Sequence, residues 1–158
     1  MNYWLMKSEP ITFGIDNLMR CANHTDHWEG VRNYQARNFM RDSMKIHDRA
    51  FFYHSNCEIP GIVGIMEIAR ESHPDFTALE LDSKYYDPKS TRDNPRWAMV
   101  SVRFLEKFKS TIPLSLLKTY SELQDMVLLK PGNRLSITPV TEKEWTFILS
   151  LNNGVKNT

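Results

Sequence analysis

Short stretches of alternating or continuous apolar residues, spaced irregularly along the chain, constrain its fold more than any other feature of the sequence. The clearest stretch is residues 97–108, where Val100, Val102 and Phe104 alternate with polar side chains, as in a half-buried β-strand. Further strands are predicted at residues 3–8, 49–55, 62–68 and 134–140. Because these strands do not alternate regularly with helices, the pattern disfavours a parallel α/β sheet.

Helices are predicted between and after the strands. A helix capped by Thr12 is expected over residues 13–20, and a second helix over residues 33–43. Capping boxes, in which two side chains satisfy the first backbone amides of a helix, are predicted at Ser121 with Gln124 and at Thr141 with Glu144. Strands outnumber helices, so the sequence predicts an α+β domain built on a small, partly closed β-barrel.

Length and composition indicate one globular domain. The chain has 158 residues, of which 41% are apolar and 25% are charged. No apolar run approaches the ~18 residues that cross a membrane, and residues 1–7 lack the features of a signal peptide. We therefore predict a single domain over residues 1–151, a frayed tail over residues 152–158, and a cytoplasmic protein, or a nuclear one in a eukaryote.

Familiar catalytic and cofactor motifs are absent from the sequence. It contains no glycine-rich nucleotide loop, no serine-hydrolase elbow and no zinc-protease motif. His24 and His27 form the only close histidine pair, and nothing nearby completes a zinc site. Cys21 and Cys57 are predicted to be free, buried thiols. We therefore predict no metal and no cofactor, while the net charge of +1 neither indicates nor excludes a nucleic-acid partner.

Three segments carry polar and aromatic residues that the fold alone does not require. Residues 7–10 end a strand at a proline, residues 28–39 lead into a helix N-terminus that favours anions, and residues 53–61 join two apolar strands. A strand end, a solvated helix face and a hairpin turn would account for the same residues structurally. Arg37, Arg41 and Lys45 are expected to share one helix face. Because like charges at this spacing repel, folding alone gains nothing from them. Binding of nucleic-acid backbone phosphates along this face is therefore the more specific interpretation, and a solvated face is the alternative.

Taken together, the residues of these three segments suit a planar heterocycle as the ligand. Trp28 offers a flat surface for stacking, while Ser8, Asn33 and Asn56 offer hydrogen bonds on short side chains. The segments contain no obvious nucleophile paired with a base. The sequence therefore favours recognition over catalysis.

At these residues the sequence resembles the EVE domain family, and the resemblance covers nearly the whole chain. The strings that carry it are YWLMKSEP (3–10), WEGVRNYQARNF (28–39), FFYHSN (51–56), PGIVGI (60–65), SKYYDPKS (83–90), DNPRW (93–97), RLSITPVT (134–141) and Glu144-Trp145. The resemblance implies a PUA-like fold, a small β-barrel of about five to six strands surrounded by helices and related to ASCH and YTH domains. It also implies recognition of modified bases in DNA or RNA. In YTH domains a Lys-Ser strand end precedes an aromatic cage, and Lys7, Ser8 and Trp28 resemble those pieces.

We therefore expect a non-catalytic module that stacks a modified base on Trp28, with the oligomeric state open between a monomer and a weak dimer. The backbone of Val31 and of residues 54–55 is expected to contact the edge of the base. Arg32, Arg37 and Arg41 are expected to hold the flanking phosphates. The full predicted base pocket comprises Lys7, Ser8, Trp28, Val31, Asn33, His54, Ser55 and Asn56.

Two other functions remain open from the sequence. The first is a hydrolase of RNA or modified nucleosides, by analogy with ASCH domains, with Lys7, Ser8, His54 and Asp87 as candidate catalytic groups. The second is a protein-interaction module that uses an exposed aromatic patch of Tyr85, Tyr86 and Trp97.

Overall fold

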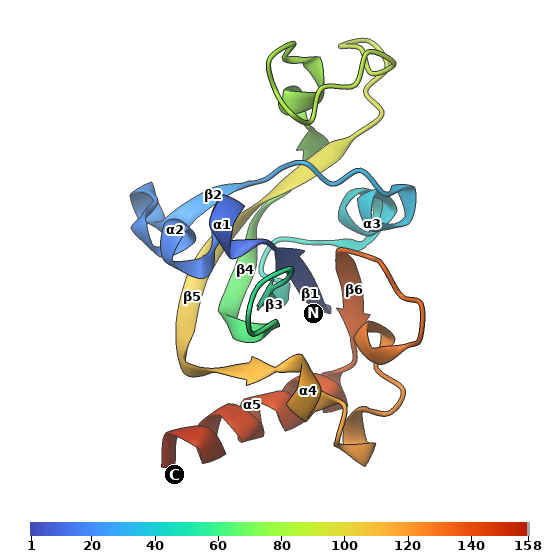
Figure 1. The fold of residues 1–158 in the computed structure, drawn as a ribbon. Coiled ribbons are helices and arrows are strands. Elements are labelled where there is room, and N and C mark those ends of the chain that lie inside the picture. Colours follow the sequence, from blue (N-terminus) through green and yellow to red (C-terminus); the bar gives the residue numbers. More distant parts are fainter. Residues whose placement is uncertain (158) are drawn as a thin grey trace.

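A six-stranded mixed sheet forms the centre of the protein in the computed structural model, which describes the backbone of residues 1–157 and the side chains of residues 1–153 (Figure 1). The strand order is β2-β5-β4-β3-β1-β6, with β1 parallel to β3 and the other neighbours antiparallel. This confirms the α+β class, whereas closure into a barrel stays a prediction because β2 and β6 are the sheet's edges. The strands are β1 (Tyr3–Ser8), β2 (Thr25–Trp28), β3 (Arg49–His54), β4 (Gly61–Pro74), β5 (Ala98–Pro113) and β6 (Ile137–Val140).

Strand periodicity located five of these strands, but the structure changes their limits. β4 and β5 extend well beyond the predicted ranges of 62–68 and 97–108, and they pair along their length with several irregularities in register. β6 is shorter than predicted and includes Pro139, which an edge strand tolerates because one side of its backbone needs no partner. β2 was missed, since its four residues, TDHW, give no clear alternation.

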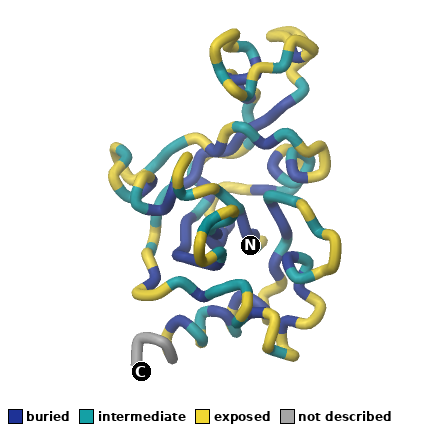
Figure 2. The backbone as a smooth tube through the Cα atoms, in the orientation of Figure 1, coloured by how far each residue is buried: buried dark blue, intermediate teal, exposed yellow. Residues whose placement is uncertain are grey.

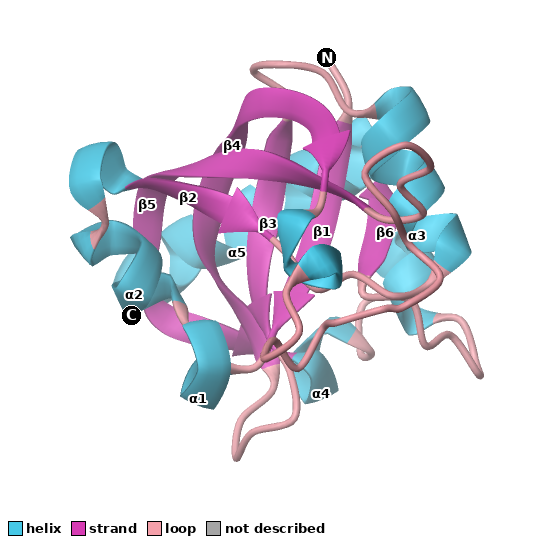
Figure 3. Ribbon diagram, turned by 90° about the horizontal axis from the view of Figure 1, so that it is seen from above, coloured by secondary structure: helices cyan, strands magenta, loops and turns pink. Residues whose placement is uncertain are grey.

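Two hydrophobic clusters lie on opposite faces of the sheet because side chains alternate along each strand. Met6 and Phe52 belong to one cluster, while Leu5 and Phe51 belong to the other. Viewed from above, the helices surround the curved sheet (Figure 3). The helices and turns are α1 (Pro10–Phe13), α2 (Ile15–Arg20), η1 (Ala22–His24), α3 (Tyr34–Asn38), η2 (Phe39–Ser43), η3 (Phe76–Leu79), α4 (Leu114–Leu117), η4 (Ser121–Leu123), η5 (Val127–Leu129) and α5 (Glu142–Asn157).

The predicted first helix is present only as α2, which begins two residues later than expected, and its predicted cap is wrong. Gly14, in extended backbone, interrupts the segment and separates α1 from α2. The amide of Gly14 donates to Asn17 Oδ1 at 2.7 Å, so Asn17 and not Thr12 satisfies the start of α2.

The predicted helix over residues 33–43 also differs from the structure. Asn33 caps α3 by accepting from the Ala36 amide at 3.1 Å, but the chain then widens into the π-turn η2. A π-turn rotates later residues relative to the α-helical period. Lys45 lies beyond the helical segment, so the predicted face shared by Arg37, Arg41 and Lys45 does not form.

One of the two predicted capping boxes is present. Thr141 Oγ1 accepts from the Glu144 amide at 3.1 Å, and Glu144 Oε1 accepts from the Thr141 amide at 2.9 Å. Ser121 instead donates to Glu122 at 3.2 Å and begins the short 3₁₀ turn η4. The backbone of α5 continues through Asn157, and Thr158 of the predicted tail lies outside the described residues.

Residues 75–97 form a lobe that projects between the end of β4 and the start of β5 (Figure 1). The buried carboxylate of Asp75 holds the base of this lobe against the rest of the fold. Asp75 accepts hydrogen bonds from the Gly30 amide at 2.9 Å, from Arg32 at 3.0 Å, and from the amide and hydroxyl of Thr77. Burial alone would raise the pKa of Asp75, but these hydrogen bonds outweigh it and lower the pKa. Most of the lobe is exposed, while its base is buried (Figure 2).

We predict that Asp75→Ala destabilises the protein by about 3 kcal/mol, because it leaves the Arg32 guanidinium and two buried amides without their acceptor. Asp16→Ala removes only a half-exposed pair with Lys107 and should cost less than about 1 kcal/mol. Urea unfolding measures both values. Because the pKa of Asp75 is lowered, its contribution should be complete above pH ~4 and lost as the pH falls through the folded-state value. Equal losses in the two variants would contradict this role.

Candidate functional site

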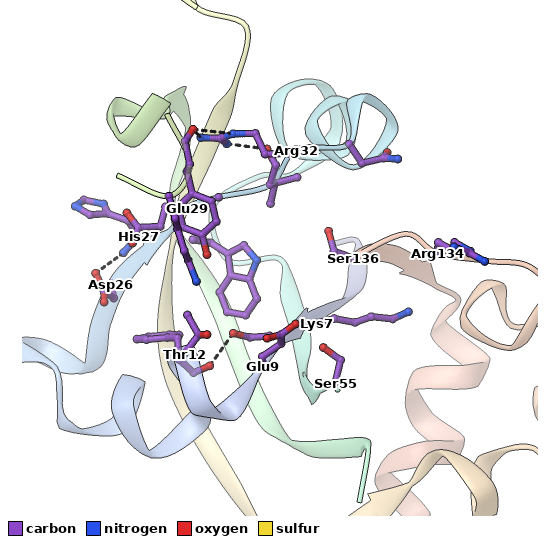
Figure 4. A pocket seen from close by; sticks show the side chains of 18 residues that line it. Lys7, Glu9, Thr12, Asp26, His27, Glu29, Arg32, Ser55, Arg134 and Ser136 are labelled. Carbon is purple, nitrogen blue, oxygen red and sulfur yellow. Dashed lines mark hydrogen bonds between the residues drawn. The ribbon is translucent and has the colours of Figure 1, made fainter. Parts of the chain in front are cut away.

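A pocket of about 720 Å³ opens at the carboxyl end of β1. Its walls come from the end of β1, from the end of α1, from the end of β2 and the segment after it, and from residues 134–136 (Figure 4). The lobe contributes Lys84 and Tyr85. This volume lies within the range of about 300–1,000 Å³ that is usual for sites that bind small molecules.

The structure brings most of the predicted base-binding residues together in this pocket. Lys7, Ser8, Trp28, Val31, Asn33 and Ser55 all line it, and they come from three separate stretches of sequence. Their role in binding stays a prediction. His54 and Asn56 are not among the lining residues.

His54 and Asn56 have structural contacts in place of the predicted ones. His54 Nε2 accepts from the Ile15 amide at 3.1 Å and so holds the start of α2. Burial lowers the pKa of His54, in keeping with a neutral ring whose Nε2 is an acceptor. Asn56 occupies the turn after β3 with a φ of 51°, and its Nδ2 donates to Glu9 Oε1 at 3.3 Å.

Trp28 is part of the pocket floor, although it is not the open stacking surface that the sequence predicted. Only 5% of the residue is exposed, and its indole packs edge-on against Phe13 and Phe52 at ring distances of 6.3 and 5.3 Å. Within the described residues nothing accepts from its Nε1, yet this nitrogen is not among the fully buried atoms that lack a partner. Trp28 thus closes the pocket floor and keeps a donor available to a ligand.

Several other polar groups in the pocket also retain hydrogen-bonding capacity. Ser8 Oγ donates to the Phe13 carbonyl at 2.7 Å and can still accept from a ligand. Asn33 uses Oδ1 to cap α3, which leaves its Nδ2 as a donor. Among the described residues, the hydroxyls of Thr12 and Ser55 have no partner. The pocket therefore combines aromatic walls with short side chains that can satisfy the edge of a planar ligand.

Gly30 allows the lobe to close one side of the pocket. It adopts a φ of 81°, and its amide is held by Asp75. A Cβ at this position would lie 2.4 Å from Cζ of Tyr85, so only glycine lets the tyrosine ring approach. The sequence predicts Tyr85 in an exposed surface patch, because nothing in a linear sequence indicates that this ring covers Gly30.

The three arginines predicted to hold phosphates are engaged within the protein. Arg32 donates to the Tyr85 carbonyl at 2.7 Å and to Asp75 at 3.0 Å, and it lines the pocket only as part of this anchor. Arg37 donates to the Arg96 carbonyl at 2.7 Å and to Asn38 at 2.9 Å. Arg41 pairs on the surface with its neighbour Asp42 at 2.9 Å. Neither Arg37 nor Arg41 lines the pocket.

Three other cations line the pocket, and sequence reasoning did not place Lys84 and Arg134 there. Among the described residues, Lys7, Lys84 and Arg134 form no ion pair with a carboxylate. Lys7 is half-buried, and this burial lowers its pKa. Lys84 and Arg134 are isolated in the sequence, so no pattern of spacing could have identified them.

The charges of the pocket are partly separated in space. Asp26 and Glu29 lie at one end, whereas Lys7, Ser136 and Arg134 lie toward the other, with the carboxylate of Glu9 near Lys7 (Figure 4). Burial, together with the nearby carboxylates of Asp75 and Asp26, raises the pKa of Glu29. An anionic part of a ligand is therefore accommodated best at the Lys7 end.

The structure does not bring together the residues that the sequence suggested for a hydrolase or for a protein-interaction module. His54 and Asp87, two of the four candidate catalytic groups, lie outside the pocket that Lys7 and Ser8 line. Asp87 instead accepts from Trp97 Nε1 at 2.7 Å. Trp97 is only 7% exposed and stacks on Tyr34, so the predicted exposed aromatic patch is wrong.

Three other features of the chain concern metal ligands, membrane-spanning helices and cysteines. No cluster of three or more potential metal ligands occurs among the described residues. No helix in the part of the chain that the structure describes is long and apolar enough to span a membrane. Cys21 and Cys57 are both free, and both are partly exposed where burial was predicted.

Comparison with known proteins assigns the family. The EVE domain profile matches residues 2–151, which is nearly the whole chain. The chain belongs to the EVE domain family. This confirms the family that the sequence strings indicated.

Relatives and solved structures similar to this EVE domain come from several organisms. Mouse thymocyte nuclear protein 1 is 48% identical over 95% of this chain and 73% of the mouse protein. A hypothetical protein from Leishmania major has a similar structure, with a TM-score of 0.94, 44% identity, and coverage of 99% of this chain and 97% of that one. The human THYN1 protein, solved in complex with DNA containing 5-methylcytosine, gives a TM-score of 0.91 at 46% identity and covers 96% of this chain and 98% of its own.

We predict that Gly30→Ala damages this EVE domain more than Gly132→Ala. Both glycines have positive φ, at 81° and 75°, so alanine should cost about 1 kcal/mol at either position. Only at Gly30 does the new methyl group collide with Tyr85, while nothing lies within 4 Å of the same atom at Gly132. Displacing that ring should cost about a further 1–3 kcal/mol in urea unfolding. Indistinguishable variants would contradict the placement of Tyr85.

Proposed function

We propose that this EVE domain is a non-catalytic module that binds a modified nucleobase of a nucleic acid in the pocket at the end of β1. The observation that carries the proposal is the lining of that pocket. Its aromatic side chains, Phe13, Trp28 and Tyr85, stand beside hydrogen-bonding groups that have no partner among the described residues. A base has apolar faces and a polar edge, so it matches both parts of the lining.

The relatives favour DNA that carries a methylated cytosine as the ligand. The human THYN1 structure contains DNA with 5-methylcytosine, and this EVE domain shares its fold over almost the whole chain. A methyl group on the base adds apolar surface that aromatic walls can bury. The name of the vertebrate relatives supports a nuclear location in a eukaryote and gives no support to a cytoplasmic one.

Access to the pocket requires a base that has left its stack. The floor is a largely buried indole, and Tyr85 closes one side, so a paired base inside a duplex cannot reach the floor. Flipping a base costs a few kcal/mol, and less when the strand is single or distorted. Contact with aromatic groups contributes about 1–3 kcal/mol per base, and each hydrogen bond about 0.5–1.5 kcal/mol. These contributions favour micromolar affinity once the costs of association are included.

The proposal excludes hydrolysis as the function because the pocket offers no activated nucleophile. Ser8 Oγ donates to a backbone carbonyl, and no histidine accepts from it. His54, the histidine nearest to it in the predicted site, is committed to the Ile15 amide. Lys7 and Glu9 flank Ser8 and also line the pocket, but neither accepts from Ser8 Oγ, and the role of Lys7 is better explained by an anionic ligand.

A panel of oligonucleotides tests the proposal. We expect the parent protein to bind an oligonucleotide with one 5-methylcytosine about 10- to 200-fold more tightly than the same sequence with cytosine, the range for one methyl group in a fitted pocket. Titrations at a single stated salt concentration, with DNA and RNA versions of each sequence, measure the ratio. Equal affinity for modified and unmodified strands would contradict the proposal.

The variant Trp28→Phe tests whether the pocket is the site of binding. It keeps an aromatic ring against Phe13 and Phe52 but removes the unpartnered Nε1 donor, so affinity for the methylated strand should fall about 2- to 10-fold. Trp28→Ala is a poorer test, because opening the core there costs about 3–5 kcal/mol. Trp145→Phe is the matched control, since Trp145 is also buried but belongs to the cluster on the other face. Equal affinity in the two tryptophan variants would contradict the assignment of the pocket.

A further inference from the structure

The cationic end of the pocket is built from two segments that the fold holds together. The Lys7 amide donates to the Ser136 carbonyl at 2.8 Å, which fixes residues 134–136 beside the end of β1. Lys7, Arg134 and Ser136 all line the pocket. Figure 4 places the three side chains at the same end, away from Asp26 and Glu29.

Neither cation at this end forms an ion pair with a carboxylate of the described residues. Lys7 Nζ lies 5.8 Å from the centre of the Tyr53 ring. Glu9, the acidic residue of this end of the pocket, makes no ion pair with Lys7 and accepts from Asn56 Nδ2 at 3.3 Å. Arg134 is exposed and has no hydrogen bond or ion pair within the described part of the chain. Folding gains little from two unpaired cations here, whereas an anionic ligand would bind them well.

We propose that Lys7, Arg134 and Ser136 form a phosphate site that holds the phosphodiester group flanking the bound base. The inference rests on the proposed function, because the base in the pocket brings its own phosphate to this rim. The Arg134 guanidinium can contact two phosphate oxygens, the Lys7 ammonium supplies a point charge, and the Ser136 hydroxyl donates one hydrogen bond.

This site replaces the phosphate track that the sequence predicted. Arg32 and Arg37 donate to backbone carbonyls of the lobe, and Arg41 is paired with Asp42, so the guanidinium groups of all three arginines already have partners within the protein. The separation of charge also sets the path of the strand. The backbone passes the Lys7 end, since Asp26 and Glu29 would repel it at the other end.

The test compares Arg134→Gln with Arg49→Gln. Arg49 is an exposed arginine of β3 whose β1 partner is Tyr3, so it lies at the opposite end of the strand pair from Lys7. Affinity is measured at several salt concentrations for the same strand with cytosine and with 5-methylcytosine. Arg134→Gln should weaken both complexes alike, about 3- to 10-fold, and lower the slope of log K against log salt by about 0.7–0.9. Arg49→Gln should leave affinity and slope unchanged.

The outcomes separate this inference from the proposed function. If the parent protein prefers the methylated strand while Arg134→Gln leaves the salt slope unaltered, the phosphate site is overturned and the base pocket stands. If the parent protein shows no preference but Arg134→Gln lowers the slope, the phosphate site stands and the base-binding proposal fails. A lower slope in Arg41→Gln, with none in Arg134→Gln, would return the phosphate contacts to the helical segment and overturn the inference.

Discussion

The pocket of this EVE domain depends on the buried carboxylate of Asp75. Its side chain is fully buried, and it joins the base of the lobe to the segment that follows β2. A buried carboxylate is stable only when hydrogen bonds replace its hydration, and here Gly30, Arg32 and Thr77 supply them. The same contacts bring Tyr85 over Gly30. One electrostatic anchor thus positions two walls of the pocket.

The sequence predicted the sheet better than the pocket, for physical reasons. Side-chain alternation follows directly from burial on a sheet, so strands such as β1, β3 and β5 could be located from periodicity. Helix limits failed where local hydrogen bonds decided them, as at Gly14, where Asn17 supplies the cap. The roles of Arg32 and Arg37 were missed because their partners lie in the lobe, 43 to 59 residues further along the chain. No pattern within one segment reports such contacts.

The net charge of the chain does not indicate how charge is distributed in the pocket. A net charge of +1 does not indicate a nucleic-acid partner, yet the pocket holds Lys7 and Arg134 at the end away from Asp26 and Glu29. Arg37 and Arg41, which were predicted to bind phosphates, have partners within the protein. Lys7 and Arg134 form no ion pair among the described residues. Trp28 has a double role, since it packs in the core and also forms part of the pocket floor. The proposed base recognition and the stability of the fold therefore depend on shared residues on the β2 side of the pocket, and on different residues on the Lys7 side.

Crystallography of this chain bound to a short DNA strand with a single 5-methylcytosine tests the account most directly. The account predicts electron density for the methylated base turned out of its stack, with its ring beside the indole of Trp28 and its phosphate at Lys7 and Arg134. Density for the DNA on another face, or for a methylated base still stacked among its neighbours with the pocket filled only by water, would contradict it.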